Sequence, residues 1–166
     1  MARSVATGFL VLCFTALGAA VAQDAAPGNG GAQETAGSAP ARADDRGFVR
    51  IKPEDLVWRH RDSGPDTAVV YGDPAKEGFY IIRVRFAPHT HSEPHYHPHD
   101  RHVTVLSGTW YTGTGSSGDM AHTVPLGPGS YMFHPAGAVH YDGAMDEEVV
   151  LEIKGMGPAP SIPAPR

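Results

Sequence analysis

The sequence contains almost no cysteine: a single residue, Cys13, in a chain of 166. It lies in an apolar run, residues 5–21, that follows Arg3 and ends in the small residues Ala20-Val21-Ala22. This order is typical of a cleaved secretory signal, so we interpret residues 1–22 as a signal peptide and expect export, to the periplasm or outside the cell. The chain after residue 22 has no cysteine, which excludes a disulfide, a thiolate metal ligand and a cysteine nucleophile.

An excess of positive charge is also absent. After residue 22 the chain carries 12 Lys and Arg against 18 Asp and Glu, a formal charge of −6. This balance argues against nucleic acid or an anionic membrane surface as a partner. A retained membrane anchor is the alternative interpretation of the N-terminal run, but the run is of marginal length for a span and Gly8, Thr15 and Gly18 dilute it. We therefore expect no membrane contact after cleavage.

Large apolar residues are missing from the stretch that follows the signal. Residues 23–46 contain no aromatic and no large aliphatic side chain, so they cannot bury enough apolar surface to offset their ordering entropy, and we expect a disordered linker. Residues 158–166 carry four prolines in nine positions and are expected to form an irregular or extended tail. The folded unit is therefore predicted at residues 47–157.

Helical periodicity is absent from this unit. Its apolar runs are short, rich in β-branched and aromatic residues and separated by Gly and Pro, which is typical of strands. One helical turn is expected at residues 52–56, where a proline stands early and acidic residues follow. Many short strands about ten residues apart predict an all-β sandwich or barrel. The expected strands are Ala68–Tyr71, Phe79–Phe86, His102–Leu106, Ser130–Phe133 and Glu148–Ile153.

Histidine, by contrast, is abundant and concentrated. Six of the ten histidines lie in HTHSEPHYHPHDRH, residues 89–102, and a short His-rich tract is a metal-binding composition. His95 and His97 have a spacing that places both side chains on one face of a strand. His140 follows a Pro-x-Gly turn that can direct it back toward the sheet. Three neutral imidazoles with an open position suit iron, manganese, zinc, copper or nickel, and spacing does not choose among them.

These residues resemble the two motifs of the cupin superfamily. The first is a His-x-His pair followed by a glutamate and a glycine, and the second is a glycine, a Pro-x-Gly turn and a histidine. The matching positions are His95, His97 and Gly108 in the first motif and Gly129, Pro135, Gly137 and His140 in the second. Ala144 stands where the second motif ends in asparagine. The resemblance covers residues 65–155 and implies a single-domain double-stranded β-helix, or jelly-roll barrel, with a divalent transition metal on the three histidines.

The chain departs from the cupin pattern at the glutamate. Seven residues before Gly108 the sequence has Arg101, and strand alternation directs Arg101 into the barrel and His102 away from it. Three interpretations stay open. In the preferred one the three histidines bind the metal and Arg101 binds an anionic substrate; in the others His102 is a fourth ligand, or the pocket holds no metal.

The remaining histidines carry weaker patterns. His134 directly precedes a proline, and lining the pocket or capping a strand are equally open for it. Aromatic residues at strand spacing are interpreted as core rather than as pocket walls. The histidines expected on the surface are His60, His89, His91, His99 and His122. The aromatic residues interpreted as core are Phe86, Trp110, Tyr111, Tyr131 and Phe133.

The functional expectation is an exported cupin-domain protein with a three-histidine metal site. If it is an enzyme, we expect a metal-dependent oxygenase or isomerase, with a dioxygenase-like reaction preferred, acting on a small oxygenated or anionic molecule. The cupin resemblance also implies decarboxylase and hydrolase activity, because the fold does not select a reaction. The competing hypothesis is a non-catalytic cupin that binds a small molecule or a metal. The expected partners are a small-molecule ligand or substrate and a second copy in a homodimer.

Overall fold

The computed structural model describes residues 43–165. The expected signal peptide and most of the expected linker lie outside the described residues. The strands are β1 (Asp66–Tyr71), β2 (Gly78–Phe86), β3 (His95–Tyr96), β4 (Arg101–Ser107), β5 (Trp110–Thr114), β6 (Val124–Leu126), β7 (Tyr131–His134), β8 (His140–Gly143), β9 (Val149–Gly157) and β10 (Ile162–Pro163), with short 3-10 turns η1 (Pro53–Asp55) and η2 (Met120–His122). No helix in this part of the chain is long and apolar enough to span a membrane.

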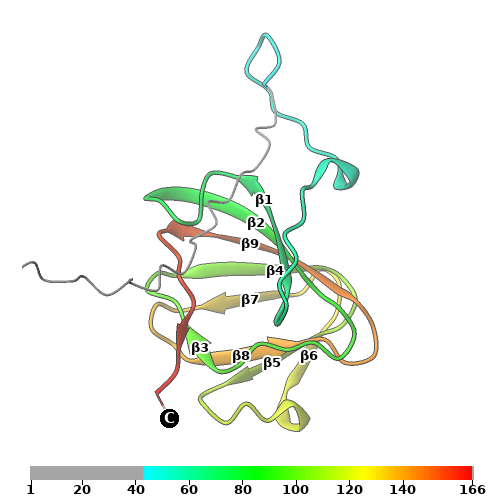
Figure 1. The fold of residues 1–166 in the computed structure, drawn as a ribbon, viewed down its shortest axis with the longest axis vertical. Helices are drawn as coiled ribbons and strands as arrows, with labels where there is room; N and C mark the ends of the chain where they lie inside the picture. The colour runs from blue at the N-terminus through cyan, green and yellow to red at the C-terminus, as the bar shows by residue number, and fades with distance from the viewer. Residues whose placement is uncertain (1–42, 166) are drawn as a thin grey trace, which may run out of the picture. The chain divides into compact units, whose positions relative to one another are not determined.

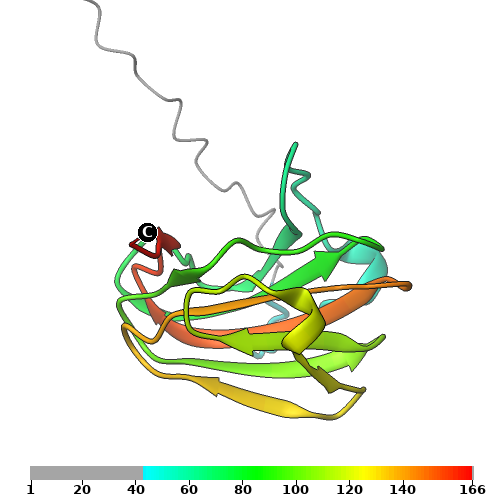
Figure 2. The ribbon, with the colours of Figure 1, turned by 90° about the horizontal axis from the view of Figure 1, so that it is seen from below.

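The strands form two antiparallel five-stranded sheets, in the orders β1-β2-β9-β4-β7 and β10-β3-β8-β5-β6. In Figure 1 the first sheet descends from β1 to β7 and the second forms the layer below it; Figure 2 shows the layers from below. Sheet neighbours are often distant in the chain, since β9 lies between β2 and β4 and β8 lies between β3 and β5. This winding of one chain through two sheets confirms the predicted all-β jelly-roll fold, the double-stranded β-helix.

The core lies between the sheets and follows strand alternation. On β9, Val149, Leu151 and Ile153 are buried, and the residues between them are partly exposed. Because successive side chains of a strand point to opposite faces, each strand gives one face to the core and one to solvent. Charged residues of the outer face pair with one another, as in the 2.8 Å contact between Arg83 and Glu152. The buried cluster is Tyr80, Ile82, Val84, Phe86, Val103, Val105, Trp110, Ala144, Val149, Leu151 and Ile153.

The five predicted strands correspond to β1, β2, β4, β7 and β9, and the predicted helical turn to η1. The other strands, β3, β5, β6, β8 and β10, were not predicted, because they are two to five residues long and contain glycine, proline or polar residues. Their pairing explains them: β5 and β8 pair through Gly113↔Tyr141, and a side chain on Gly113 would overlap the Tyr141 ring. Glycine at this position lets the aromatic ring pack against the strand beside it.

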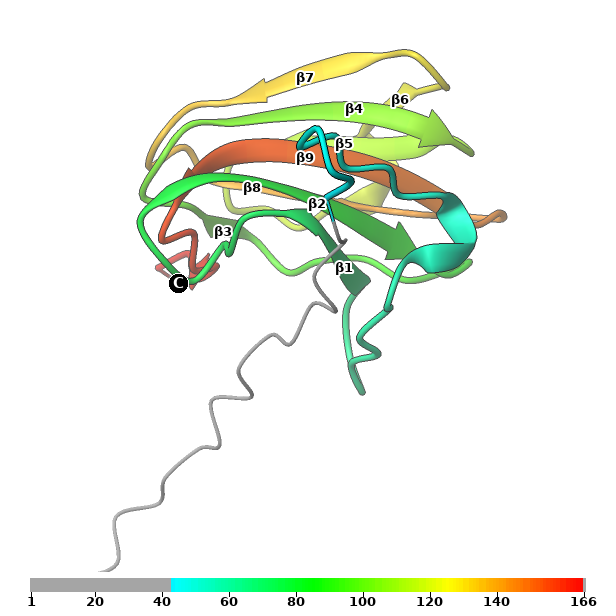
Figure 3. The same cartoon turned by 90° about the horizontal axis from the view of Figure 1, so that it is seen from above.

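The Pro-rich tail lies extended along the second sheet. Its β10 pairs with β3 through Ile162↔Tyr96 and Pro163↔His95, and Figure 3 shows the C-terminal segment beside β3. Ala164 N donates a hydrogen bond to Pro94 O at 2.9 Å. The tail therefore covers the edge of the sheet next to the histidine pair.

A buried carboxylate, Asp142, ties the segment before β3 to β8 and β5. Its side chain is 7% exposed. Trp110 Nε1 donates to one carboxylate oxygen at 3.0 Å and the Ser92 hydroxyl donates to the other. Ser92 N also donates to the Asp142 carbonyl at 2.8 Å. Because every donor here is buried or half-buried, removal of the carboxylate leaves the indole N–H without its partner.

We expect Asp142→Ala to lower the free energy of unfolding by about 2–3 kcal/mol, since it leaves a buried donor unsatisfied and opens a gap. Urea unfolding monitored by tryptophan fluorescence measures the change. The matched control is Asp146→Ala, which removes an exposed carboxylate and should change the free energy by less than about 0.5 kcal/mol. Equal effects in the two variants would contradict the structural role of Asp142.

Candidate metal centre

His95, His97 and His140 come together where β3 and β8 pair. His95 and His140 are directly opposite each other in this antiparallel pair, so their side chains share a face. His97 lies two residues beyond His95 and points the same way. The ligand atoms of the three histidines all lie within 4.8 Å of one another. The structure therefore brings together the three histidines that the motif spacing selects, two of them buried and His95 half-buried.

The three rings share one tautomeric state. Their Nδ1 atoms lie 2.8 Å from Glu93 O, 2.9 Å from Pro160 O and 3.0 Å from Ala138 O, for His95, His97 and His140 respectively. A carbonyl only accepts, so each Nδ1 carries the proton and each neutral ring has its lone pair on Nε2. Hydrogen bonds of this kind orient the histidines of metal sites. The donor set therefore fits a divalent metal.

The environment keeps the rings neutral. Burial, followed by the Arg101 guanidinium, lowers the pKa of His97 from 6.5 to about 3. Burial also lowers the pKa of His140, against the opposing effect of its hydrogen bond to Ala138. A neutral imidazole is the form that binds a metal.

Arg101 lies inside the barrel, as strand alternation predicts. Its side chain is 8% exposed, and its NH1 donates a hydrogen bond to His97 Nε2. Burial lowers the pKa of Arg101, but a guanidinium stays protonated in proteins. No carboxylate among the described residues forms an ion pair with it. A cation therefore sits against the ligand atom of one of the three histidines.

A row of buried polar side chains crosses the first sheet at the same level. The register joins Tyr80 to Gly155, Gly155 to Arg101 and Arg101 to His134. Within residues 43–165, the Tyr80 hydroxyl, Arg101 Nε and both ring nitrogens of His134 are buried without a hydrogen-bond partner. The His134 and His140 ring centroids are 3.9 Å apart. His134 therefore lines the site, and its role as a strand cap is excluded.

His102 points away from the site. It is exposed, and its Nδ1 bonds to the Tyr131 hydroxyl at 2.8 Å, so the interpretation of His102 as a fourth ligand is wrong. The interpretation of Tyr131 and Phe133 as core is also wrong, because they lie 56% and 40% exposed on the outer face of β7. Phe86 and Trp110 are buried core, as predicted. The histidines predicted on the surface, His60, His89, His91, His99 and His122, are all exposed.

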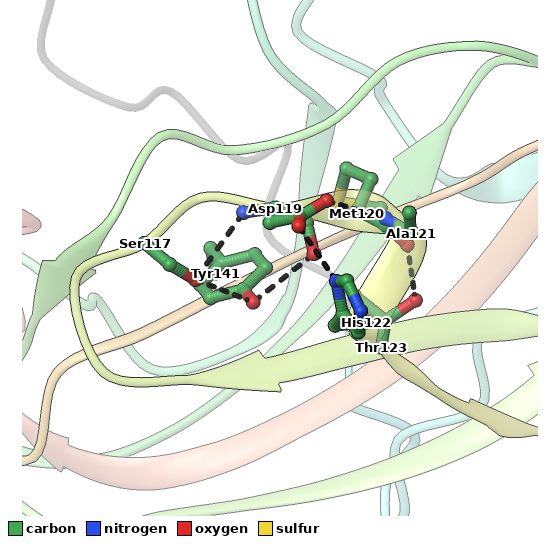
Figure 4. Close-up of polar contacts among 7 residues, drawn as sticks. All are labelled: Ser117, Asp119, Met120, Ala121, His122, Thr123 and Tyr141. Atoms are coloured by element: carbon green, nitrogen blue, oxygen red, sulfur yellow. Dashed lines mark hydrogen bonds and ion pairs between the residues drawn. The ribbon is translucent and has the colours of Figure 1, made fainter.

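A loop before β6 places serine, aspartate and histidine side chains near one another without forming a catalytic triad. Figure 4 shows His122 Nδ1 bonded to Asp119 at 2.6 Å, while the Ser117 hydroxyl bonds to the Tyr141 hydroxyl at 2.9 Å. The serine is thus directed at Tyr141, and a triad needs a serine bonded to the histidine. The contacts tie the loop to β8.

The chain matches a family model described as the ChrR cupin-like domain over residues 46–159. It belongs to the ChrR cupin-like family. This membership confirms the cupin resemblance, and it leaves the reaction of the ChrR cupin-like domain to be argued from its site.

Known proteins match this chain at low sequence identity. Germin-like protein 4-1 from Oryza sativa subsp. japonica is 31% identical over 90 residues, which cover 49% of this chain and 35% of the germin-like protein. The chain thus spans about a third of that relative's length. Among solved structures, the polyketide cyclase RemF from Streptomyces resistomycificus matches with a TM-score of 0.60 at 18% identity, over 72% of this chain and 87% of RemF.

Two further solved structures match the fold of this chain. A cupin-2 domain from Rhodospirillum rubrum has a TM-score of 0.54 at 16% identity, with 72% of this chain and 80% of that chain covered. KdgF from Halomonas sp. has a TM-score of 0.51 at 19% identity, with 64% and 93% covered. These structural matches show that the ChrR cupin-like domain has the double-stranded β-helix fold.

We expect acid to destabilise this domain through the buried histidines. Burial lowers the pKa of His97 to about 3 and that of His134 to about 2, from 6.5 in an unfolded chain. Between these values the unfolded state binds more protons than the folded state. The free energy of unfolding should therefore fall as the pH drops below about 6.5, by about 1.4 kcal/mol per pH unit for each histidine.

Urea unfolding at several pH values, with EDTA present, measures this slope. His134→Phe should reduce the slope by the contribution of about one proton, whereas His99→Phe, at an exposed position, should leave it unchanged. The interpretation fails if His134→Phe and the wild type show the same slope.

Proposed function

We propose that this ChrR cupin-like domain is an exported metal-dependent cupin in which His95, His97 and His140 bind a divalent transition metal through Nε2. The observation that carries the proposal is the shared tautomer: three Nδ1 atoms bonded to carbonyls, with ligand atoms within 4.8 Å of one another. Imidazole ligands suit iron, manganese, zinc, copper and nickel. Export is supported by the apolar run at residues 5–21 and the small residues that end it.

The charge of the site favours an anionic substrate. The three histidines are neutral ligands, so they leave the charge of a divalent ion uncompensated, and the Arg101 guanidinium adds another positive charge. Three protein ligands also leave positions open for a small molecule. When bound, the metal would supply a Lewis acid or a redox centre. Arg101 would hold a carboxylate or enolate with its planar fork of donors.

The reaction we propose is that of an oxygenase or isomerase, with a dioxygenase-like reaction first, on a small oxygenated or anionic molecule. The neutral, nitrogen-only donor set supports it, because an open position beside an uncompensated cation suits an oxygenated ligand. RemF and KdgF share the fold at 18% and 19% identity. Their activities are therefore no guide to this reaction.

A second candidate function is a non-catalytic module that binds a small molecule. The observation in its favour is the hydrogen bond from Arg101 to His97 Nε2, which engages a ligand atom of the metal site with a side chain. In this case Arg101 would hold an anionic ligand in the barrel without turnover.

We expect the untagged protein to contain near-stoichiometric metal, because three convergent Nε2 atoms form its site, and His140→Ala to lose that metal. Elemental analysis of the two proteins, purified identically, measures it. The matched control is His122→Ala, which removes an exposed histidine and should retain the metal. Wild-type protein that stays free of metal after reconstitution with several divalent ions would contradict the metal site.

Turnover separates the enzyme from the binding module. With the metal restored, we expect oxygen consumption that requires both a substrate, screened among diketones, catechols and flavonols, and an intact His140. An oxygen electrode measures the rate, and His140→Ala should abolish it because the variant cannot hold the metal. Flat traces with iron, manganese, copper and nickel would count against the oxygenase.

A further inference from the structure

In the proposed metal site, Arg101 and the metal compete for the same lone pair, that of His97 Nε2. His97 donates from Nδ1 to Pro160 O, so its only lone pair is on Nε2. In the structure Arg101 donates a hydrogen bond to that atom, and the proposed metal needs the same atom. A lone pair serves one of them at a time, so metal binding requires the guanidinium to leave His97. This inference rests on the proposed function.

The register places two other polar groups beside Arg101. Tyr80 on β2 and His134 on β7 lie in the same row of the first sheet, on either side of β4, which carries Arg101. Gly155 separates Tyr80 from Arg101, and a Cβ on Gly155 would lie 2.9 Å from the Tyr80 hydroxyl oxygen. The hydroxyl therefore reaches across Gly155 toward Arg101. Glycine is required here because a larger residue would block that reach.

These groups are buried and have hydrogen-bonding capacity to spare. Tyr80, Arg101 and His134 are 1%, 8% and 4% exposed. The Tyr80 hydroxyl, Arg101 Nε and both His134 nitrogens lack a partner among residues 43–165. Unsatisfied buried polar groups are costly in a folded protein. Together the three side chains carry several buried hydrogen-bonding groups that a ligand could satisfy.

The charges around Arg101 favour a negatively charged ligand. The carboxylate that acts on Arg101 from the opposite sheet is Asp142, and its oxygens already accept from Trp110 and Ser92. No acidic residue in the described part of the chain forms an ion pair with Arg101. A buried cation without an ion-pair partner is destabilising, and a carboxylate matches the planar fork of a guanidinium with two parallel hydrogen bonds.

We propose that a small carboxylate binds between Arg101, Tyr80 and His134, draws the guanidinium off His97, and so couples anion binding to metal binding. Each ligand then raises the affinity for the other by the same factor, because coupling between two sites is reciprocal. Without the anion, the guanidinium and the divalent ion repel each other in the barrel. With it, the anion neutralises one positive charge, and His97 Nε2 is released.

The test measures Zn²⁺ affinity by titration calorimetry in sodium acetate and in sodium chloride of equal ionic strength. In wild type we expect Zn²⁺ to bind about tenfold more tightly in acetate. Arg101→Met removes the competing guanidinium, so we expect tight Zn²⁺ binding in both salts and no acetate effect. His122→Ala, at an exposed position, should retain the wild-type acetate effect. Association of Zn²⁺ with acetate in solution lowers the apparent affinity in acetate by the same factor for every variant, so it cancels when the acetate effects of two variants are compared.

The alternatives give different results. An acetate effect of equal size in wild type and Arg101→Met would mean that acetate coordinates the metal directly. Equal Zn²⁺ affinities of wild type in both salts would mean that anion binding and metal binding are not coupled. Either result overturns the inference while leaving the metal site intact. No Zn²⁺ binding by any folded variant would overturn the proposed function together with the inference. Folding is checked by circular dichroism, and Arg101→Gln replaces Arg101→Met if the latter fails to fold.

A second variant tests the other side of the anion site. Tyr80→Phe removes only the hydroxyl, which has no hydrogen-bond partner in the described residues, so the barrel should fold. We expect acetate to raise the Zn²⁺ affinity of this variant by only about threefold or less, instead of the tenfold expected for wild type, because one donor to the carboxylate is missing. An acetate effect identical to that of wild type would remove Tyr80 from the proposed anion site.

Discussion

The chemistry of this barrel depends on how three imidazole rings are held. His95 and His140 each bond to a carbonyl two residues earlier in the chain, whereas His97 bonds to Pro160, 63 residues away. The first two bonds are local consequences of how β3 and β8 begin. The third needs the Pro-rich tail to lie against β3 as β10. The tail is therefore a structural part of the site, since it fixes the tautomer of the ring that faces Arg101.

Arg101 changes the electrostatics that a cupin barrel usually has. A glutamate at this position would neutralise part of the charge of a bound metal, whereas a guanidinium adds to it. The barrel accommodates this cation deep between the sheets, opposite the histidines and in a row with Tyr80 and His134. The arrangement leaves positive charge and several unsatisfied hydrogen-bonding groups in the row around Arg101. A negatively charged guest is the natural complement of that row.

Local patterns and distant pairings differed in how well they could be predicted. The inward direction of Arg101 and the outward direction of His102 followed from a two-residue period, which is a property of a single strand. His134 stayed open because a histidine before a proline at a strand end fits two local structures. Tyr80 was not singled out, because it lies in a predicted strand and belongs to no motif. Tyr131 was assigned to the core, although β7 is an edge strand whose outer face is exposed.

The sequence by itself determined the all-β class, most of the long strands and the three histidines that converge, because strand periodicity and motif spacing act over a few residues. The tertiary structure alone decided that Arg101 contacts His97, that Pro160 orients the same ring, and that Tyr80 and His134 join them. These relations depend on the register between β2, β9, β4 and β7 and on the packing of one sheet against the other. Register joins residues that lie far apart in the chain, and no local period encodes it.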